Sequence, residues 1–184
     1  MGTRKLELKD IAGYLPYDLY ATRNNFVGVI NQINRNGNFV ISCSNWHENI
    51  NDKNHHKPIL RPLSDLYKTI THNGKEIVPI VELAKMAIPN LKWDINKKMS
   101  IAEIISKSSF DTILFGYTGL HRYFKYVNET DRYFYYVYQY DNVEYIPDQI
   151  QLFDYLHELK IDYRGLIDAG LAVNVNTLEN NPYK

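Results

Sequence analysis

The chain has 184 residues and a formal net charge of zero, with 45% hydrophobic and 23% charged residues. This composition is that of a folded globular protein, and it excludes a disordered chain. It also argues against a partner such as duplex DNA, because proteins that coat DNA use an excess of Lys and Arg to displace counterions from phosphates. The single cysteine, Cys43, excludes an internal disulfide.

Charge is distributed unevenly along the chain. Residues 1–110 carry 15 Lys and Arg against 10 Asp and Glu, whereas residues 111–184 carry 6 against 11. The halves could attract each other within one fold or between copies, so a homo-oligomer is one interpretation and chance surface variation is the other. No signal peptide is recognisable, and no window reaches the roughly 18 apolar residues of a membrane span. We therefore expect a cytoplasmic protein without a membrane partner.

Turn signals divide the start of the chain into short elements. Asp10 is a candidate N-cap for a short helix that Pro16 ends. The β-rich runs 26–33 and 38–43 are separated by an Asn-Gly pair, which predicts a hairpin. The polar, Asn-rich segment 44–56 predicts a loop, and we expect its His residues to be solvated.

The middle of the chain contains further short elements. Pro58 and Pro62 favour an extended segment, and Ser64 is a candidate N-cap for a short helix. A second Asn-Gly pair leads into a predicted strand at 76–80, and residues 81–88 predict a helix.

The second half of the chain is rich in β-branched and aromatic residues. Strands are predicted at 110–117, at 121–127 and 132–140 as a second hairpin, and at 143–146. Residues 148–160 predict the longest helix, with an apolar stripe that includes Ile150.

After that helix, the segment 163–170 predicts a second, shorter helix, and 171–178 alternates like a strand. The tail 179–184 is expected to fray. Mixed strands and helices without βαβ alternation predict the α+β class: a single domain over 1–184, with antiparallel hairpins and a long C-terminal helix packed on the sheet. A subdivision near residue 110 is an alternative.

The segment RYFYYVYQY at 132–140 contains five Tyr and one Phe. Alternate residues of a strand face opposite sides, so aromatic residues lie on both faces. Both faces could be covered, or cross-strand Tyr pairs could stabilise the hairpin. In the functional interpretation, Tyr133, Tyr135 and Tyr138 form a stacking platform, and Arg122 and Arg132 meet phosphates. A protein interface is the third interpretation, because Tyr and Arg are enriched in binding hot spots.

Arg61 lies between two prolines that stiffen its backbone. It is a further candidate ligand-binding residue, with a structural ion pair or packing of its aliphatic stem as the alternative. The His residues at 47, 55 and 56 match no zinc spacing, so we expect neither a metal site nor a cofactor. No catalytic constellation is recognisable, and we expect a protein that is not an enzyme.

Three segments of the chain form a combined pattern: Leu15-Pro16-Tyr17, Ile59 through Leu66, and the closing GLIDAGLAVNVNTL at 165–178. This pattern resembles a family of small proteins from phages and prophages of gut Bacteroides-type bacteria. The resemblance implies a mobile-element protein in the cytoplasm of a bacterial host cell and supplies no catalytic residues. By analogy of context, it suggests counter-defence by sequestering a nucleotide-like signal of host immunity.

The prediction is therefore a non-catalytic intracellular binding protein of phage or prophage type. Its expected partner is a small anionic, nucleotide-like ligand. The alternative is a protein-interaction module that inhibits or modulates a host protein. An unrecognised hydrolase ranks third.

Overall fold

The computed structural model describes residues 4–23, 26–33, 39–43, 46–49, 56–87, 112–115, 122–128, 132–138 and 142–184. The chain forms two compact units. Unit 1 comprises Met1–Asp65, Thr71–Lys75 and Asp154–Lys184, and unit 2 comprises Leu66–Ile70 and Glu76–Phe153. Each unit has its own sheet and its own buried side chains, and the combination of helices with antiparallel strand pairs confirms the predicted α+β class.

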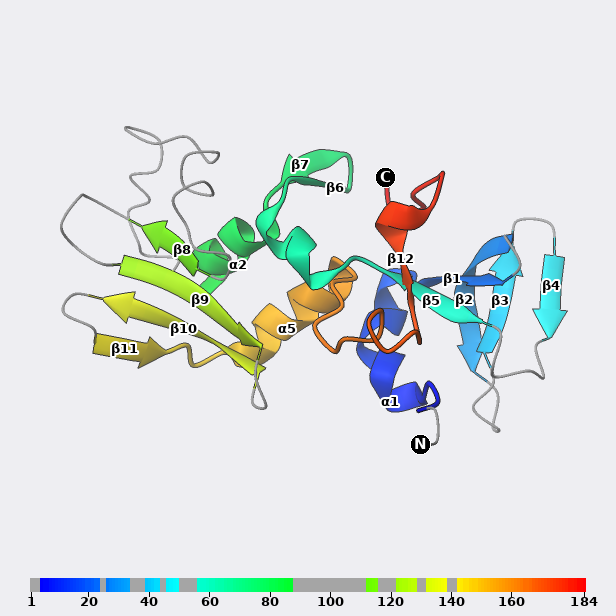
Figure 1. Ribbon diagram of the computed structural model, residues 1–184, viewed down its shortest axis with the longest axis horizontal. Helices are drawn as coiled ribbons and strands as arrows, with labels where there is room; N and C mark the ends of the chain where they lie inside the picture. The colour runs from blue at the N-terminus through cyan, green and yellow to red at the C-terminus, as the bar shows by residue number, and fades with distance from the viewer. Residues whose placement is uncertain are drawn as a thin grey trace. The chain divides into compact units, whose positions relative to one another are not determined.

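The sheet of unit 1 has the strand order β12-β5-β1-β2-β3-β4 (Figure 1). Only the β12–β5 pair is parallel among the described pairs of this sheet; the others are antiparallel. The β2–β3 pair confirms the predicted first hairpin. The strands are β1 Tyr20–Arg23, β2 Phe26–Ile33, β3 Phe39–Cys43, β4 Trp46–Asn49, β5 Lys57–Leu60 and β12 Val173–Asn174.

Two expectations for the segment 44–56 are wrong. Part of it forms strand β4, which pairs with β3 and so extends the sheet. His56 is only 4% exposed, because it directly precedes β5, whose residues Pro58 to Leu60 are also buried. Because this segment is polar, its composition predicted neither strand β4 nor the burial of His56.

The first helix begins earlier than predicted. Helix α1 spans Leu8–Ile11 and continues into the 3-10 helix η1, Ala12–Tyr17, which contains Pro16. Asp10 is therefore not the N-cap. It lies in the first turn, where its carboxylate accepts the backbone N–H of Glu7 at 3.0 Å and pairs with Arg4.

A tight hairpin and a helix follow strand β5. The 3-10 helix η2, Leu63–Tyr67, already includes Ser64, so Ser64 is not its cap. Strands β6, Ile70–His72, and β7, Lys75–Ile77, are joined by Asn73 and Gly74, whose φ angles of 50° and 73° confirm the predicted turn. Helix α2 spans Pro79–Ala87 and confirms the predicted helix, with proline at its first position.

Unit 2 contains an antiparallel sheet of order β11-β10-β9-β8, which confirms the strands predicted between residues 110 and 146 (Figure 1). The strand predicted at 171–178 is wrong in its extent, because only Val173–Asn174 form β12 in unit 1 and Val175–Thr177 form the 3-10 helix η3. The central β9–β10 pair is the predicted aromatic hairpin. The strands are β8 Thr112–Phe115, β9 Arg122–Asn128, β10 Arg132–Tyr138 and β11 Asn142–Tyr145.

Helix α5 spans Gln149–Glu158, ten residues, and is shorter than the predicted 148–160. Leu152 and Leu156 are buried, but Ile150 is 76% exposed and does not belong to the buried stripe. In unit 2, Phe153 packs edge-on against Phe134 of β10 at 5.5 Å between ring centroids, so the start of the helix is packed on the sheet.

No helix forms at 163–170, contrary to the prediction. The segment consists of turns in which Gly165 and Gly170 have φ angles of 72° and 70°, a region that favours glycine. The carboxylate of Asp162 accepts the backbone N–H groups of Leu166 and Ile167 at 2.9 and 2.7 Å. These bonds satisfy backbone donors that a helix would otherwise use.

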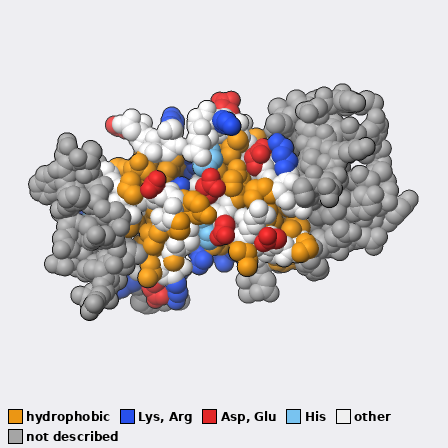
Figure 2. Space-filling view, turned by 180° about the vertical axis from the view of Figure 1, so that it is seen from behind, with side chains coloured by type: hydrophobic (Ala, Val, Ile, Leu, Met, Phe, Trp, Pro, Cys, Tyr) orange, Lys and Arg blue, Asp and Glu red, His pale blue; other side chains and the backbone are white. Residues whose placement is uncertain are grey.

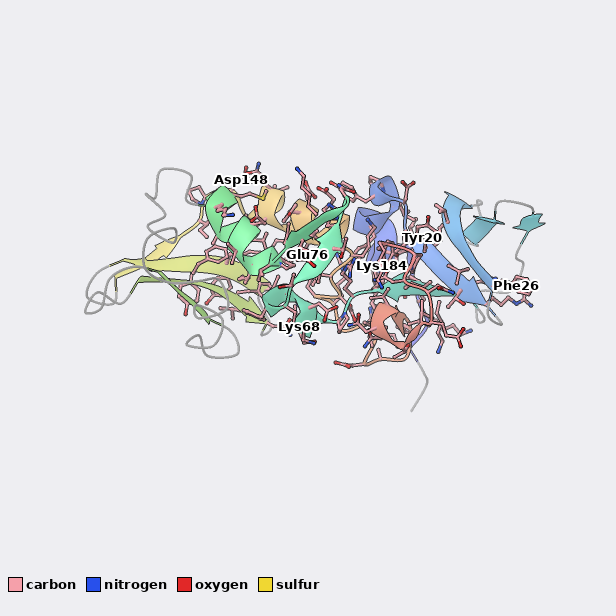
Figure 3. All side chains as sticks on the ribbon, turned by 90° about the horizontal axis from the view of Figure 1, so that it is seen from above. Tyr20, Phe26, Lys68, Glu76, Asp148 and Lys184 are labelled. Carbon is pink, nitrogen blue, oxygen red and sulfur yellow. The ribbon has the colours of Figure 1, made fainter. Side chains whose placement is uncertain are left out.

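The C-terminal tail is docked rather than frayed. In the β1–β5 register, Ala21 lies opposite Pro58, so Tyr20 would next lie opposite Ile59. The hydroxyl of Tyr183 occupies this step of the ladder: it accepts the N–H of Tyr20 at 3.1 Å and donates to the carbonyl of Ile59 at 2.8 Å. Figure 3 labels Tyr20 and Lys184, which directly follows Tyr183. A side chain thus extends a strand pair.

Gln149 has the same role in unit 2. In the β10–β11 register, Tyr135 lies opposite Tyr145, so Phe134 would next lie opposite Ile146. The Gln149 amide accepts the N–H of Phe134 at 2.8 Å and donates to the carbonyls of Phe134 and Ile146 at 2.7 and 3.0 Å. This anchors the start of α5 to the strand that carries the tyrosines.

In the described part of the chain, no helix is both long and apolar enough to cross a membrane.

Candidate ligand-binding face

One face of the β9–β10 hairpin belongs to the core of unit 2. Phe124 and Phe134 are fully buried and stack at 5.5 Å between ring centroids, and Tyr126 is 3% exposed. Phe153 of α5 covers Tyr126 and Phe134 with edge-on contacts. The interpretation of buried aromatic residues is therefore correct for this face.

The opposite face of β10 carries Tyr133 and Tyr135. Both side chains are partly buried, and their rings lie 6.0 Å apart at an interplanar angle of 39°. The alternation of the strand places them together, away from Phe134. We call this pair the outer tyrosine face. Because the two rings are tilted relative to each other, they do not form one flat surface, and a planar ligand would stack on one ring at a time.

Arg132 begins β10 and is exposed, and its Nε donates to Oδ1 of Asn128 at 3.2 Å. Strand alternation gives Arg132 the same face as Phe134, opposite to Tyr133 and Tyr135. Asn128 is its cross-strand neighbour on β9. The predicted charge therefore lies at the end of the strand and not on the outer tyrosine face.

The other predicted residues are distributed over the chain. Arg122 lies in β9 opposite Phe115, and Tyr138 lies in β10 opposite Asn142. The side chains of both fall outside the part that the structure describes. Arg61 belongs to unit 1, whereas the other five candidate residues belong to unit 2.

Arg61 is 4% exposed and makes structural contacts within unit 1. Its Nη2 donates to the carbonyl of Thr71 at 3.1 Å, and its guanidinium carbon lies 5.8 Å from the ring centroid of Tyr183. Its backbone is bonded to Lys160 and Asp162 at 2.8 Å each. Burial lowers the pKa of Arg61, while the charge of Asp65 opposes this shift.

Sequence reasoning missed Lys160, which lies close to Arg61. Lys160 is 7% exposed, and its Nζ lies 5.8 Å from the ring centroid of Tyr17 and 5.2 Å from that of Tyr183. Burial lowers its pKa to about 8, against the opposing charges of Glu158 and Asp18. No motif marks this lysine, because the rings around it come from distant parts of the chain.

A buried histidine is the other titratable group that sequence reasoning left without a role. His157 is 8% exposed, its Nε2 lies 2.8 Å from the hydroxyl of Tyr163, and that hydroxyl accepts the Nε–H of Arg164 at 3.1 Å. The arrangement favours donation from Tyr163 to His157. His157 Nδ1 lies 3.7 Å from Asp154, beyond hydrogen-bond distance. Burial lowers the pKa of His157.

The packing of this histidine indicates a structural role. The ring of Tyr14 meets His157 edge-on at 4.8 Å, and the Tyr14 hydroxyl donates to the carbonyl of Ile161 at 2.8 Å. Gly13 also approaches the imidazole so closely that no side chain fits between them. These contacts enclose His157 on several sides, as expected for a core group.

Among the described residues, no group of three or more His, Cys, Asp or Glu side chains is arranged to hold a metal ion. On the face shown in Figure 2, acidic and basic side chains are interspersed among hydrophobic ones. This pattern differs from the continuous basic stripe of a protein that follows a nucleic-acid backbone.

Comparisons with models of protein families, with curated proteins and with solved structures found no match.

Proposed function

We propose that the protein binds a small, planar, anionic ligand of the nucleotide type on the outer tyrosine face, without transforming it. The observation that carries the proposal is the division of the hairpin's aromatic residues. Phe124, Tyr126 and Phe134 form the core, while Tyr133 and Tyr135 remain together on the other face.

The physical argument is stacking. Stacking of one base on one aromatic side chain contributes about 1–3 kcal/mol to the binding free energy, and it does so for any of the bases. Tyrosine loses little side-chain entropy on binding, and its hydroxyl can also form a hydrogen bond. Arg132, exposed at the start of the same strand, can supply a guanidinium for a phosphate group.

The biological setting follows from the resemblance of three segments to small phage and prophage proteins. In a bacterial host cell, a protein that holds a nucleotide signal without degrading it would lower the free concentration of that signal. We propose this counter-defence role, with the outer tyrosine face as the binding surface.

The second candidate is a protein-interaction module that inhibits or modulates a host protein. Partly buried tyrosines beside an exposed arginine are also typical of binding hot spots. In unit 1, Phe26 is 75% exposed at the start of β2, which adds a separate exposed aromatic side chain (Figure 3).

Thermal unfolding against linear and cyclic nucleotides, with mass spectrometry of the released ligand, tests the proposal. Ligand at about 100 times the dissociation constant stabilises the folded state by about 2.7 kcal/mol. We expect a higher melting temperature and intact ligand. An altered ligand would indicate an enzyme. No shift across the panel, together with a host protein recovered by the wild type and lost with Tyr135→Ala, would favour the second candidate.

A further inference from the structure

Two cations of unit 1 are deeply buried. Arg61 and Lys160 are 4% and 7% exposed, so both are more than nine-tenths buried. Within the described part of the chain, neither forms an ion pair with a carboxylate at 4 Å or less. Buried charges in proteins are generally paired or bound to a counter-ion, because an isolated buried charge is costly. Two such cations together require an explanation.

The backbone fixes both side chains in the same region. Arg61 forms a parallel bridge with Ile161, and its N–H donates to the carbonyl of Lys160 at 2.8 Å. Lys160 has a φ angle of 61°, a left-handed conformation that is uncommon for a residue with a Cβ. This conformation belongs to the cap that ends helix α5, in which the N–H of Lys160 donates to the carbonyl of His157 at 3.0 Å and the N–H of Ile161 to that of Leu156 at 2.9 Å.

The ring of Tyr183 lies beside both cations. The guanidinium carbon of Arg61 is 5.8 Å from the ring centroid, and Nζ of Lys160 is 5.2 Å from it. The charge of Arg61 contributes to the lowered pKa of Lys160, so the two cations repel each other. An anion that contacts both head groups would reduce this repulsion and compensate both charges.

Both cations retain hydrogen-bond donors. The guanidinium has five N–H donors, of which the carbonyl of Thr71 takes one at 3.1 Å. The ammonium of Lys160 has three, of which the carbonyl of Glu158 takes one at 2.6 Å. No other hydrogen bond from these two head groups is formed within the described residues. The remaining donors suit the oxygens of a tetrahedral oxyanion.

We propose that Arg61 and Lys160 form a binding site for a phosphate group, with the ring of Tyr183 as its apolar wall. A dianion is favoured over a single carboxylate because it neutralises two charges. The phosphate could be free or part of a phosphorylated small molecule. The site lies in unit 1 and does not depend on the outer tyrosine face of unit 2.

The test compares thermal unfolding of the full chain in sodium phosphate and in sodium chloride at equal ionic strength. We expect a higher melting temperature in phosphate. Lys160→Met removes the charge while keeping most of the aliphatic stem, and it should lose this phosphate-specific shift. Lys57→Met is the matched control, because Lys57 is exposed on β5 and its substitution should leave the shift unchanged.

Lys160→Met also removes the hydrogen bond to the carbonyl of Glu158 and the contacts with Tyr17 and Tyr183. Each variant is therefore compared with itself in phosphate and in chloride, so that a change in its basal stability does not enter the shift. Lys160→Arg should keep a phosphate-specific shift. Retention of the full shift by Lys160→Met, or a wild-type protein equally stable in phosphate and chloride, would overturn the proposal.

Further measurements distinguish free phosphate from a phosphorylated ligand. They also distinguish binding at this site from binding at the outer tyrosine face. Adenosine monophosphate is compared with inorganic phosphate and with adenosine, using the wild type, Lys160→Met and Tyr135→Ala. Inorganic phosphate should stabilise Tyr135→Ala and wild type equally. If the nucleotide panel gives no shift but phosphate does, the proposed function fails while the phosphate site stands.

Discussion

Gly13 of η1 lies directly against the imidazole of His157. A Cβ placed on Gly13 would come within 2.5–2.6 Å of both ring nitrogens, closer than atoms in contact can approach. Gly13→Ala should therefore destabilise the protein by roughly 1–3 kcal/mol, the usual range for overpacking a core. Urea denaturation measures the change in the free energy of unfolding.

The double variant Gly13→Ala/His157→Ala provides the control. Removing the imidazole opens space for the added methyl group, so the two substitutions should be less than additive. Strict additivity would show that the contact between Gly13 and His157 does not limit stability.

Acid should destabilise the protein through His157. Burial and the charge of Arg164 lower its folded-state pKa below 6.5, whereas Asp154 opposes the shift. The unfolded chain therefore binds a proton more readily than the folded protein. The contribution of neutral His157 to the free energy of unfolding is complete above pH 6.5, the pKa of the unfolded chain. It is lost as the pH falls from there towards the lower folded-state pKa. Melting temperatures from about pH 8 to about pH 5 measure it. His157→Gln should flatten this dependence; an unchanged profile would contradict the assignment.

The hydroxyl of Tyr183 should stabilise the sheet of unit 1. Tyr183→Phe leaves the N–H of Tyr20 and the carbonyl of Ile59 without this partner, at a cost of about 1–3 kcal/mol. Chemical denaturation of Tyr183→Phe measures the loss, with deletion of exposed Lys184 as the control that should have little effect. If the tail were frayed, as its sequence suggests, both variants would match the wild type.

Gln149 should support the hairpin that carries the outer tyrosine face. Gln149→Ala removes the amide that pairs with the N–H and carbonyl of Phe134, which predicts a loss of about 1–3 kcal/mol. Gln151→Ala is the matched control, because the Gln151 side chain is exposed on the same helix. Hydrogen exchange at the Phe134 amide should accelerate in Gln149→Ala. Equal protection in both variants would contradict this role.

Turns, hairpins and a helix were predictable where neighbouring residues alone determine them. The Asn-Gly pair at 73–74 gave a correct turn, and the β-rich runs around 26–43 and 121–140 gave correct hairpins, because turn chemistry and alternation act over a few residues. The helix at Gln149–Glu158 was recognisable from its spacing, but the exposure of Ile150 depends on which side the tertiary structure covers.

Features that depend on distant contacts were not predictable from the sequence. The tail is polar and ends the chain, yet Tyr183 is held by Tyr20 and Ile59, more than 120 residues away. Segment 163–170 has helical spacing, but the carboxylate of Asp162 accepts the N–H groups of Leu166 and Ile167 in a turn. In each case a hydrogen bond with a side chain decides the local structure.

The candidate site was predictable in part. Alternation correctly separated Tyr133 and Tyr135 from Phe134, since period two is a property of any strand. Lys160 gave no signal, because its burial depends on rings at Tyr17 and Tyr183 that only the fold brings together.

The most direct test of the central claim is nuclear magnetic resonance of the tyrosine rings during titration with a nucleotide that raises the melting temperature. Stacking predicts that the ring signals of Tyr133 and Tyr135 shift to saturation, while that of buried Tyr14 does not move. Tyr135→Ala should weaken binding by roughly tenfold or more, the loss expected for one stacked base. Saturable binding that leaves the signals of Tyr133 and Tyr135 unchanged would contradict the assignment of the outer tyrosine face as the ligand site.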